Sequence, residues 1–351
     1  MTADLLTSFM QHALELAKRG YYTVSPNPMV GCVIVKNNKM IGEGWHEVYG
    51  GPHAEINALK QAGQAAENAS LFITLEPCCH SGKTPPCVSA IIQAKIKNVY
   101  IACVDPNPLI SGKGIALLKQ AGIVIHFGLC EVEARELNKI FFHFIIKKRP
   151  YVIAKWAMSL DGKTKVNYHD EKQISNQKSQ IHTHHLRHCV DAILIGSATA
   201  IADNPKLTVR SMLVNKQPLR IVLASHGNLP FNLEIFNPNL AGKTIIVVTK
   251  NVNKLWLKIA KEKGIIVWQV KEENERIDLH VILIKLAEEN ISSLLVEGGE
   301  TIHAEFFAQN LVDEVQVYLA PKIISKLNNK ITLKNMKYEW LENNLLIRGE
   351  I

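Results

Sequence analysis

The chain has 351 residues, 47% of them hydrophobic, which suits two domains that each bury a core. Its formal net charge of +8 fits a nucleic-acid-binding protein or an enzyme for phosphorylated substrates, and the dispersed lysines favour neither class. No segment approaches the ~18 uninterrupted apolar residues of a membrane helix, so we expect no membrane-spanning segment and no membrane partner.

In the first half, apolar periodicity alternates helices with strands. Helices are predicted at residues 5–19, 54–62, 88–95 and 114–121 and from about residue 132. Strands are predicted at residues 29–36, 39–43, 71–75, 99–104 and 123–126, with a turn at Asn37-Asn38 between the first two. This order predicts an α/β/α arrangement, a sheet between two helical layers.

The second half begins directly after the basic segment Lys147-Lys148-Arg149-Pro150, with a strand at residues 151–156. Strand and helix alternation then resumes, with strands at residues 192–195, 219–224, 244–249, 294–296 and 314–319. We therefore expect two α/β domains, residues 1–149 and 150–351, with almost no linker between them.

A glycine loop in the second half is a candidate phosphate site. Glu297-Gly298-Gly299-Glu300-Thr301 joins a predicted strand to a predicted helix at residues 302–309, and would offer backbone amides and a helix N-terminus to a phosphate. About half of such loops are only tight turns. No G-x-G-x-x-G follows a strand here, so a standard Rossmann dinucleotide site is not expected.

The number and spacing of the cysteines indicate the redox state of the compartment in which the protein works. There are seven, an odd number, and four of them stand far apart in the sequence, Cys32, Cys103, Cys130 and Cys189. No secretory hydrophobic segment precedes the first predicted helix. Together these features predict a reducing, cytoplasmic location.

The strongest chemical signal is the pair of segments His53-Ala54-Glu55 and Glu76-Pro77-Cys78, continued to Cys87. Zinc deaminases carry H-x-E followed by P-C-x-x-C, in which the glutamate moves protons and is not a ligand. This pattern predicts a catalytic zinc site with three protein ligands and Glu55 as the proton carrier. A closed structural zinc knuckle or a redox pair is the alternative, with Cys79 or His80 as a fourth ligand.

The second segment departs from the general deaminase spacing. Eight residues separate Cys78 from Cys87, so either these two cysteines bracket a long loop or Cys79 replaces Cys78. We favour His53, Cys78 and Cys87, because Cys87 follows two prolines and opens a predicted helix whose N-terminus favours a thiolate. Cys79 is better interpreted as a small packed side chain.

Taken together, these segments resemble, over nearly the whole chain, the bifunctional deaminase-reductase family of riboflavin biosynthesis. Besides the zinc segments, the matching stretches are Pro26-Asn27-Pro28-Met29-Val30-Gly31, Asp105-Pro106-Asn107-Pro108, Lys155-Trp156-Ala157-Met158-Ser159-Leu160-Asp161-Gly162-Lys163, Asp203-Asn204-Pro205-Lys206-Leu207-Thr208-Val209-Arg210 and Val296-Glu297-Gly298-Gly299. The eight-residue gap before Cys87 is the spacing that this family uses.

The resemblance implies an N-terminal cytidine-deaminase-like domain and a C-terminal dihydrofolate-reductase-like domain, which binds NADPH without G-x-G-x-x-G. It implies zinc-dependent removal of an amino group from a phosphorylated ribosylaminopyrimidine, then NADPH reduction of the ribosyl group. The residues that would hold the first substrate are Asn27, His46, His80, Lys83, Asp105 and Asn107. Asn27 and Asn107 are alternatively plain turn formers, and Asp105 a strand-end cap.

For the reductase, the resemblance implies that Arg187, Leu207, Arg210 and Glu297 contact substrate. The implied NADPH contacts are Ala157, Thr199, Asp203, Gly299, Glu300, Thr301, Ile302, His303, Ala304 and Glu305. Lys155, a lysine in an apolar strand, is predicted to polarise the sugar carbon, with Asp203 or Glu297 helping in proton transfer. Arg187 and Arg210 suit a phosphate clamp, and surface charge is the alternative for either.

One stretch departs from the family pattern, and another has the spacing of a metal site. Between residues 165 and 174 the family has a Gly-Glu-Ser segment, and this chain has Asn167-Tyr168-His169-Asp170-Glu171-Lys172-Gln173. His182, His184, His185 and His188 fall in one helical stretch, and His184 and His188 have the i, i+4 spacing of metal ligands. No carboxylate or cysteine with ligand geometry accompanies them except Cys189. A helix with exposed imidazoles is therefore preferred to a second metal site.

Two rival functions are weighed against this one. A deaminase of nucleic-acid bases would fit the charge, but the second α/β domain and the 7% aromatic content argue against nucleic acid as a partner. A zinc-stabilised binding module with an inactive second domain is the other. A homo-oligomer, dimer or tetramer, is expected because two-domain enzymes of this kind often pair symmetrically.

Overall fold

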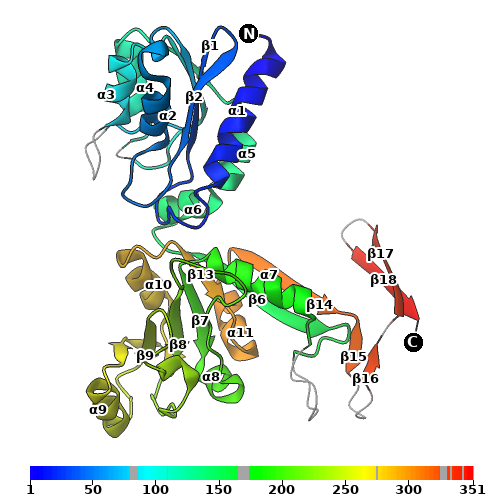
Figure 1. Ribbon diagram of the computed structural model, residues 1–351. Helices are drawn as coiled ribbons and strands as arrows, with labels where there is room; N and C mark the ends of the chain where they lie inside the picture. The colour runs from blue at the N-terminus through cyan, green and yellow to red at the C-terminus, as the bar shows by residue number, and fades with distance from the viewer. Residues whose placement is uncertain are drawn as a thin grey trace. The chain divides into compact units, whose positions relative to one another are not determined.

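The computed structural model (Figure 1) describes residues 1–79, 86–108, 110–164, 174–273, 276–324, 330–332, 334–341 and 344–350. It comprises two compact units, Met1–Pro150 with Leu283–Ser292, and Tyr151–Ile282 with Ser293–Ile351. No helix among the described residues is both long and apolar enough to cross a bilayer.

The first unit is built on a five-stranded sheet in the order β2-β1-β3-β4-β5. Its strands are β1 (Gly31–Lys36), β2 (Lys39–Trp45), β3 (Ser70–Leu75), β4 (Asn98–Cys103) and β5 (Val124–Phe127). β1 runs antiparallel to both of its neighbours, whereas β3, β4 and β5 are parallel. The carboxyl ends of the parallel strands therefore meet at one edge, where sites of α/β sheets usually lie.

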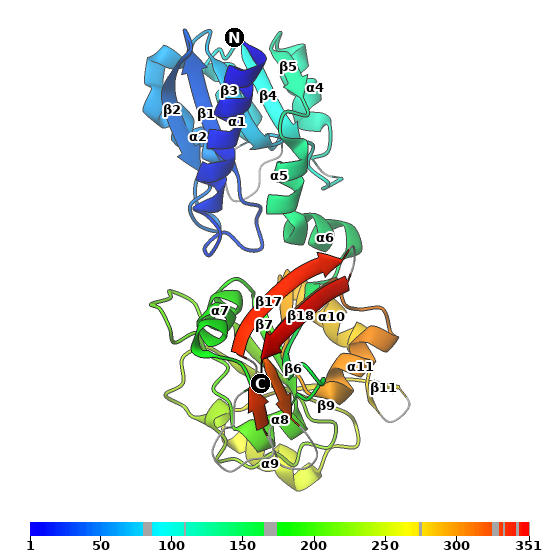
Figure 2. The ribbon, with the colours of Figure 1, turned by 90° about the vertical axis from the view of Figure 1, so that its right-hand side faces the viewer.

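Helices cover both faces of this sheet (Figures 1 and 2). They are α1 (Ala3–Lys18), α2 (Ala54–Ala62) continued by the short η1 (Gly63–Ala66), α3 (Cys87–Gln93), α4 (Lys113–Gln120), α5 (Glu131–Leu137) and α6 (Lys139–Lys147). On one face Ile34 and Ile73 pack with Ala58 of α2, Ile91 of α3 and Leu118 of α4. A second apolar cluster holds α1, α5 and α6 against the other face. The predicted α/β/α layering is confirmed.

The start of α2 is fixed by a close approach to β2. At Gly44 a Cβ atom would lie 2.6 Å from the backbone oxygen of Ala54, so only glycine lets the helix begin directly on the strand. His53 is the residue immediately before α2. Its imidazole is thereby held at the edge of the sheet.

One predicted helix differs from the structure. A single helix was expected from about residue 132, and the chain instead forms α5 and α6 with a break at Asn138, whose φ is −107°. The Asn138 side chain is buried and makes two hydrogen bonds with the backbone of Met29, one accepted from N and one donated to O, both 2.8 Å. This tertiary contact stabilises the break, which apolar periodicity does not reveal.

The second unit has a seven-stranded parallel sheet in the order β10-β9-β8-β7-β13-β6-β14. Its strands are β6 (Tyr151–Ser159), β7 (Ala192–Gly196), β8 (Leu219–Leu223), β9 (Thr244–Val248), β10 (Ile266–Gln269), β13 (Ser293–Val296) and β14 (Glu314–Ala320). Every strand predicted in either half is present, with ends within three residues of the prediction. The largest difference is at β6, which continues to Ser159 because it stays paired with β14 up to Ala320.

The remaining elements connect these strands or follow them. The helices are α7 (Gln177–His188), α8 (Ser197–Asp203), η2 (Glu234–Phe236), α9 (Lys254–Glu262), α10 (Leu279–Glu288) and α11 (Glu300–Ala308). Three two-stranded pairs complete the chain, β11 (Glu272–Glu273) with β12 (Arg276–Ile277), β15 (Lys322–Ile324) with β16 (Lys330–Thr332), and β17 (Lys334–Leu341) with β18 (Asn344–Glu350). The second predicted α/β domain is confirmed.

Candidate active sites

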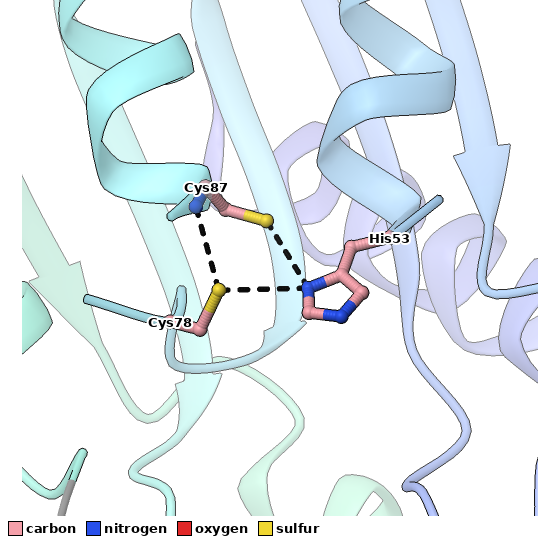
Figure 3. A group of neighbouring side chains, drawn as sticks. All are labelled: His53, Cys78 and Cys87. Carbon is pink, nitrogen blue, oxygen red and sulfur yellow. Dashed lines mark hydrogen bonds between the residues drawn. The ribbon is translucent and has the colours of Figure 1, made fainter. Parts of the chain in front are cut away.

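Three predicted ligands meet at the edge of the first sheet. His53 precedes α2, Cys78 follows β3, and Cys87 is the first residue of α3. His53 Nδ1 lies 3.2 Å from Cys87 Sγ and 3.5 Å from Cys78 Sγ, and the side chains point toward one another (Figure 3). Within the described ranges this is the single group of three or more potential metal ligands, all within 4.8 Å of one another.

The donor set fits zinc. Zn–S bonds of ~2.3 Å and Zn–N bonds of ~2.0 Å in a tetrahedron place N and S about 3.5 Å apart, which matches the distances from His53. The backbone N–H of Cys87 also points at Cys78 Sγ, at 3.4 Å. Contact with Cys87 and then His53 lowers the pKa of the Cys78 thiol to about 4. Cys79 is half-buried and packs against the core under α2 and α3.

Glu55 lies two residues beyond His53, in the first turn of α2. It is only 3% exposed. Burial, followed by the negative charge of Cys78, raises the pKa of this carboxyl to about 7. A carboxyl of this kind can take up and release a proton near neutral pH.

Two of the three candidate ligands, His53 and Cys78, line a pocket of about 370 Å³. Four residues implied by the family resemblance line it, Asn27, His46, Asp105 and Asn107, together with Glu55. His46 Nδ1 lies 3.0 Å from the carbonyl of Pro52 and donates to it, so its Nε2 accepts from Asn27 Nδ2 at 3.1 Å. Phe141 and Phe144 of α6 supply an apolar wall. His80 and Lys83 lie outside the described residues.

One buried carboxylate beside the pocket, Glu76, was not among the site residues predicted from the sequence. Glu76 is 4% exposed, and its two oxygens accept backbone N–H groups of Asp105 (3.4 Å), Gly112 (2.9 Å) and Ile115 (3.3 Å). Asp105 in turn accepts from the backbone N–H of Asn107 at 2.8 Å. Glu76 therefore shapes the loop that brings two of the predicted residues to the pocket, through partners that no local motif reveals.

In the second unit, a buried ion-pair network joins three predicted residues. Glu297 directly follows β13 and accepts two hydrogen bonds from Arg187 of α7, at 2.6 and 3.0 Å, and one from Lys155 Nζ at 3.2 Å. Its side chain is 9% exposed. Burial alone would raise the pKa of this carboxyl, but the charges of Arg187 and Lys155 outweigh burial and lower it to about 2. Glu297 is therefore ionised at neutral pH.

Arg210 and Leu207 lie next to this network. Arg187 Nη1 donates to the carbonyl of Thr208 at 3.4 Å, and Arg210 Nη1 donates to the hydroxyl of the same residue at 3.1 Å. Leu207 is buried in a left-handed conformation with φ 51°, which is uncommon for leucine. The two arginines and Thr208 therefore form one polar strip beside Glu297.

The glycine loop and the start of α11 gather several predicted cofactor residues. A Cβ at Gly299 would lie 3.4 Å from Thr199 Oγ1, so the loop passes close to α8. Both ring nitrogens of His303 are buried without a hydrogen bond of ordinary geometry, although backbone groups of Gly298 and Lys155 lie near enough to influence its pKa. Burial lowers that pKa, so the ring is neutral at pH 7.

The other predicted cofactor residues differ in position. Four of them are exposed, namely Glu300, Thr301, Ala304 and Asp203. Asp203 is the last residue of α8. Ile302 packs toward Gly196 and Gly298, Glu305 is ion-paired with Arg276, and Ala157 lies within β6. The divergent loop at 165–173 lies outside the described residues. The four histidines of α7 are in no metal-ligand group that the described part of the chain contains.

Each half of the chain matches a known protein family. Residues 4–103 match the model of the cytidine and deoxycytidylate deaminase zinc-binding region, and residues 150–339 match the RibD C-terminal domain. The riboflavin biosynthesis protein RibD of Aquifex aeolicus (strain VF5) is 42% identical over 348 residues, 99% of this chain and 95% of that protein. The RibD of Escherichia coli (strain K12) is 37% identical, over 90% of this chain and 88% of that protein.

Solved structures give the same result. RibD of Acinetobacter baumannii, form 1, aligns with a TM-score of 0.81 at 37% identity, covering 97% of this chain and 93% of that one. A diaminohydroxyphosphoribosylaminopyrimidine deaminase/5-amino-6-(5-phosphoribosylamino)uracil reductase of Thermotoga maritima aligns with a TM-score of 0.79 at 33% identity, covering 99% of both chains. Both likenesses extend over both units.

Proposed function

This chain belongs to the RibD family of bifunctional riboflavin-biosynthesis enzymes, which join a deaminase to a reductase, and from that membership we propose how its two sites work. Residues 1–149 carry the deaminase and residues 150–351 the reductase. The deaminase acts on 2,5-diamino-6-ribosylamino-4(3H)-pyrimidinone 5′-phosphate. The reductase then uses NADPH to turn the ribosyl side chain into ribityl, giving 5-amino-6-ribitylaminouracil 5′-phosphate.

His53, Cys78 and Cys87 hold the zinc ion, as their donor set and spacing support. Zinc bound there supplies a Lewis acid that activates water for attack on the amino-bearing ring carbon. Glu55, buried in the same pocket wall, accepts a proton from that water. It passes the proton to the ring nitrogen and a second proton to the departing ammonia, as a general base and then a general acid.

The pocket residues position the pyrimidine. Asn27 and His46 form a fixed hydrogen-bonded pair, and they hold the polar edge of the base. Phe141 and Phe144 face its flat side. Asp105 and Asn107, on the loop that Glu76 organises, contact the ribose, and His80 and Lys83 are proposed to hold the phosphate.

In the reductase, Lys155 is the cation beside the sugar carbon, and Glu297 orients it. Because Glu297 is held ionised by two cations, it positions Lys155 and substrate hydroxyls and does not donate the proton. Arg187 is bound bidentately to Glu297 and so serves to fix it. Arg210, which is exposed, is left as the phosphate-binding arginine.

NADPH, which supplies the hydride, fits the loop at residues 298–299 and the start of α11. The bare backbone at Gly299 beside Thr199 leaves room for close approach. The unsatisfied nitrogens of the neutral His303 offer one donor and one acceptor to a polar cofactor group. Asp203 and residues 300–305 are proposed to contact the cofactor from α8 and α11.

We also propose a homo-oligomer in the cytoplasm. β14 is the last strand of its sheet, and Val315, Val317 and Leu319 expose 47%, 39% and 38% of their surface along it. Such an apolar edge strand is usually covered in the native assembly. No disulfide joins the described cysteines, which suits a reducing compartment.

The observation that carries the proposal is the group of His53, Cys78 and Cys87, two of which, His53 and Cys78, line the same pocket as Glu55. Its test is Glu55→Gln, with ammonia release and NADPH oxidation measured together on the diaminopyrimidine phosphate. We expect the variant to keep wild-type zinc content while ammonia release falls about 10²- to 10⁴-fold. Exposed Glu47→Gln is the matched control and should behave as wild type.

Other results of this assay would support a different function for the protein. Zinc-loaded wild-type protein that releases no ammonia would be a binding module. Ammonia release from single-stranded nucleic acid in preference to the pyrimidine phosphate would indicate a base deaminase. Ammonia release without NADPH oxidation would leave the reductase half unsupported.

A further inference from the structure

Tyr318 lies beside the ion-pair network of the reductase half, next to Lys155. It stands on β14 opposite Ala157 of β6, two positions beyond the residue paired with Lys155. Since paired residues and residues two apart share a face of the sheet, its ring stands next to the Lys155 side chain. The Lys155 Nζ atom lies 5.5 Å from the ring centroid. Tyr318 is only half-buried, so its hydroxyl remains accessible.

The hydroxyl of Tyr318 has a partner that reaches solvent. It lies 2.7 Å from Nδ1 of His182, on α7. His182 itself is exposed. A continuous path for a proton therefore runs from solvent through the imidazole to the phenol beside Lys155. Of the charged groups on the surrounding elements, Lys155 on β6, Glu297 after β13 and Arg187 on α7 form the ion-pair network beside it, and the Thr183 side chain of α7 also contacts the phenol.

Under the function proposed above, on which this inference rests, the reductive step consumes one proton. The C1′–O4′ bond of the ribosyl group is replaced by C1′–H: the hydride brings its electron pair to C1′, and the bonding pair stays on O4′. O4′ becomes a hydroxyl only by taking up a proton. The pKa of Glu297 is about 2, so its carboxylate carries no proton to donate at neutral pH. Asp203 is exposed at the end of α8. Neither residue suits this task.

We propose that Tyr318 donates this proton and that His182 replaces it. When His182 is protonated, its Nδ1–H donates to the phenol oxygen and leaves the phenol O–H directed at the substrate. Tyr318 gives its proton to O4′ as the C1′–O4′ bond breaks, and takes the Nδ1 proton of His182. The imidazole then recovers a proton from solvent. Burial raises the pKa of the phenol, which keeps the donor protonated between turnovers.

Tyr318→Phe tests the donor, because it removes the hydroxyl and keeps the ring against Lys155. We expect kcat for NADPH oxidation to fall about 10²- to 10³-fold with little change in KM. Ammonia release by the same preparation should be unchanged, which controls for folding. Tyr338→Phe is the matched control, since Tyr338 is 78% exposed on β17, and it should reduce at the wild-type rate.

A second measurement needs no turnover. With ¹³C-labelled tyrosine, His182→Asn should shift the Tyr318 resonance of the free enzyme, because the imidazole that contacts the phenol is replaced. The same variant should lower kcat about tenfold. A wild-type enzyme that does not oxidise NADPH would refute the proposed function. An active wild type with an equally active Tyr318→Phe, an effect on KM alone, or a Tyr318 resonance insensitive to His182 would overturn this inference only.

Discussion

Glu297→Gln tests whether the buried network of the reductase half is held together by an ionised carboxylate. Lowering the pKa of Glu297 from its usual 4.5 to about 2 corresponds, at about 1.4 kcal/mol per pKa unit, to about 3 kcal/mol of stability at neutral pH. Because Lys155 and Arg187 are also largely buried, the neutral amide leaves two cations without an anion. We therefore expect the variant to be about 3 kcal/mol less stable at pH 7.

The sign of the pH dependence follows from the same shift. A carboxyl whose pKa is depressed by folding contributes fully above its unfolded pKa and loses that contribution as pH falls toward the folded value. Glutamine does not titrate, so the stability gap between wild type and variant should shrink between pH 4.5 and 2. At pH 3 about 1 kcal/mol of the gap should remain.

Urea unfolding followed by pulsed hydrogen exchange of peptides from β6 and β13 measures this gap in the reductase half alone. Glu272→Gln is the matched control, since Glu272 pairs with Lys250, which is 75% exposed, and such pairs contribute less than about 1 kcal/mol. A gap for Glu297→Gln that is no larger than the control, or that does not change with pH, would refute the reasoning.

Three further predictions concern the ligands and the pockets. Cys78→Ser should lose most of its zinc, whereas Cys79→Ser should keep about one ion per chain, as measured by atomic absorption; equal retention would exclude Cys78 as a ligand. Glu76→Gln should raise the deaminase KM about tenfold with zinc retained, because the loop carrying Asp105 loses its anchor, and an unchanged KM would assign Glu76 a purely structural role. Arg210→Met should raise the KM of the phosphorylated substrate in reduction by about 10- to 100-fold and leave a dephosphorylated analogue unaffected; equal effects on both would argue against a phosphate contact.

The candidate metal ligands of the deaminase half were predictable because the information is local. His53, Cys78 and Cys87 each stand where a strand gives way to a helix or a helix begins, and both types of element have clear apolar periodicity. Turns between neighbouring elements place such residues at one sheet edge. The structure brings together the three residues that the spacing favoured and packs Cys79 against the core.

The reductase network was not accessible in this way. Lys155 and Glu297 are 142 residues apart, and Arg187 and Glu297 are 110 apart. They meet because β13 lies between β7 and β6 in the sheet, an order that periodicity does not encode. Glu297 was predicted as a site residue from the family resemblance, whereas Lys155 also stood out as a lysine in an apolar strand and Arg187 as a suitable phosphate ligand. The break at Asn138 and the role of Glu76 were missed for the same reason, since both depend on partners distant in the chain.

The proposed zinc ligands would also act as a cross-link. Cys78 lies 25 residues from His53 and nine from Cys87, so one ion bound by all three would close two loops and join α2, the end of β3 and α3. In the unfolded chain these three residues are far apart, and bringing them together costs loop-closure entropy. In the folded domain they already lie side by side, so this cost does not reduce the affinity for the ion. Zinc must then bind the folded deaminase half more tightly than the unfolded one and stabilise it by mass action. The metal affinity of this chain is therefore also a measure of how well its first half is folded.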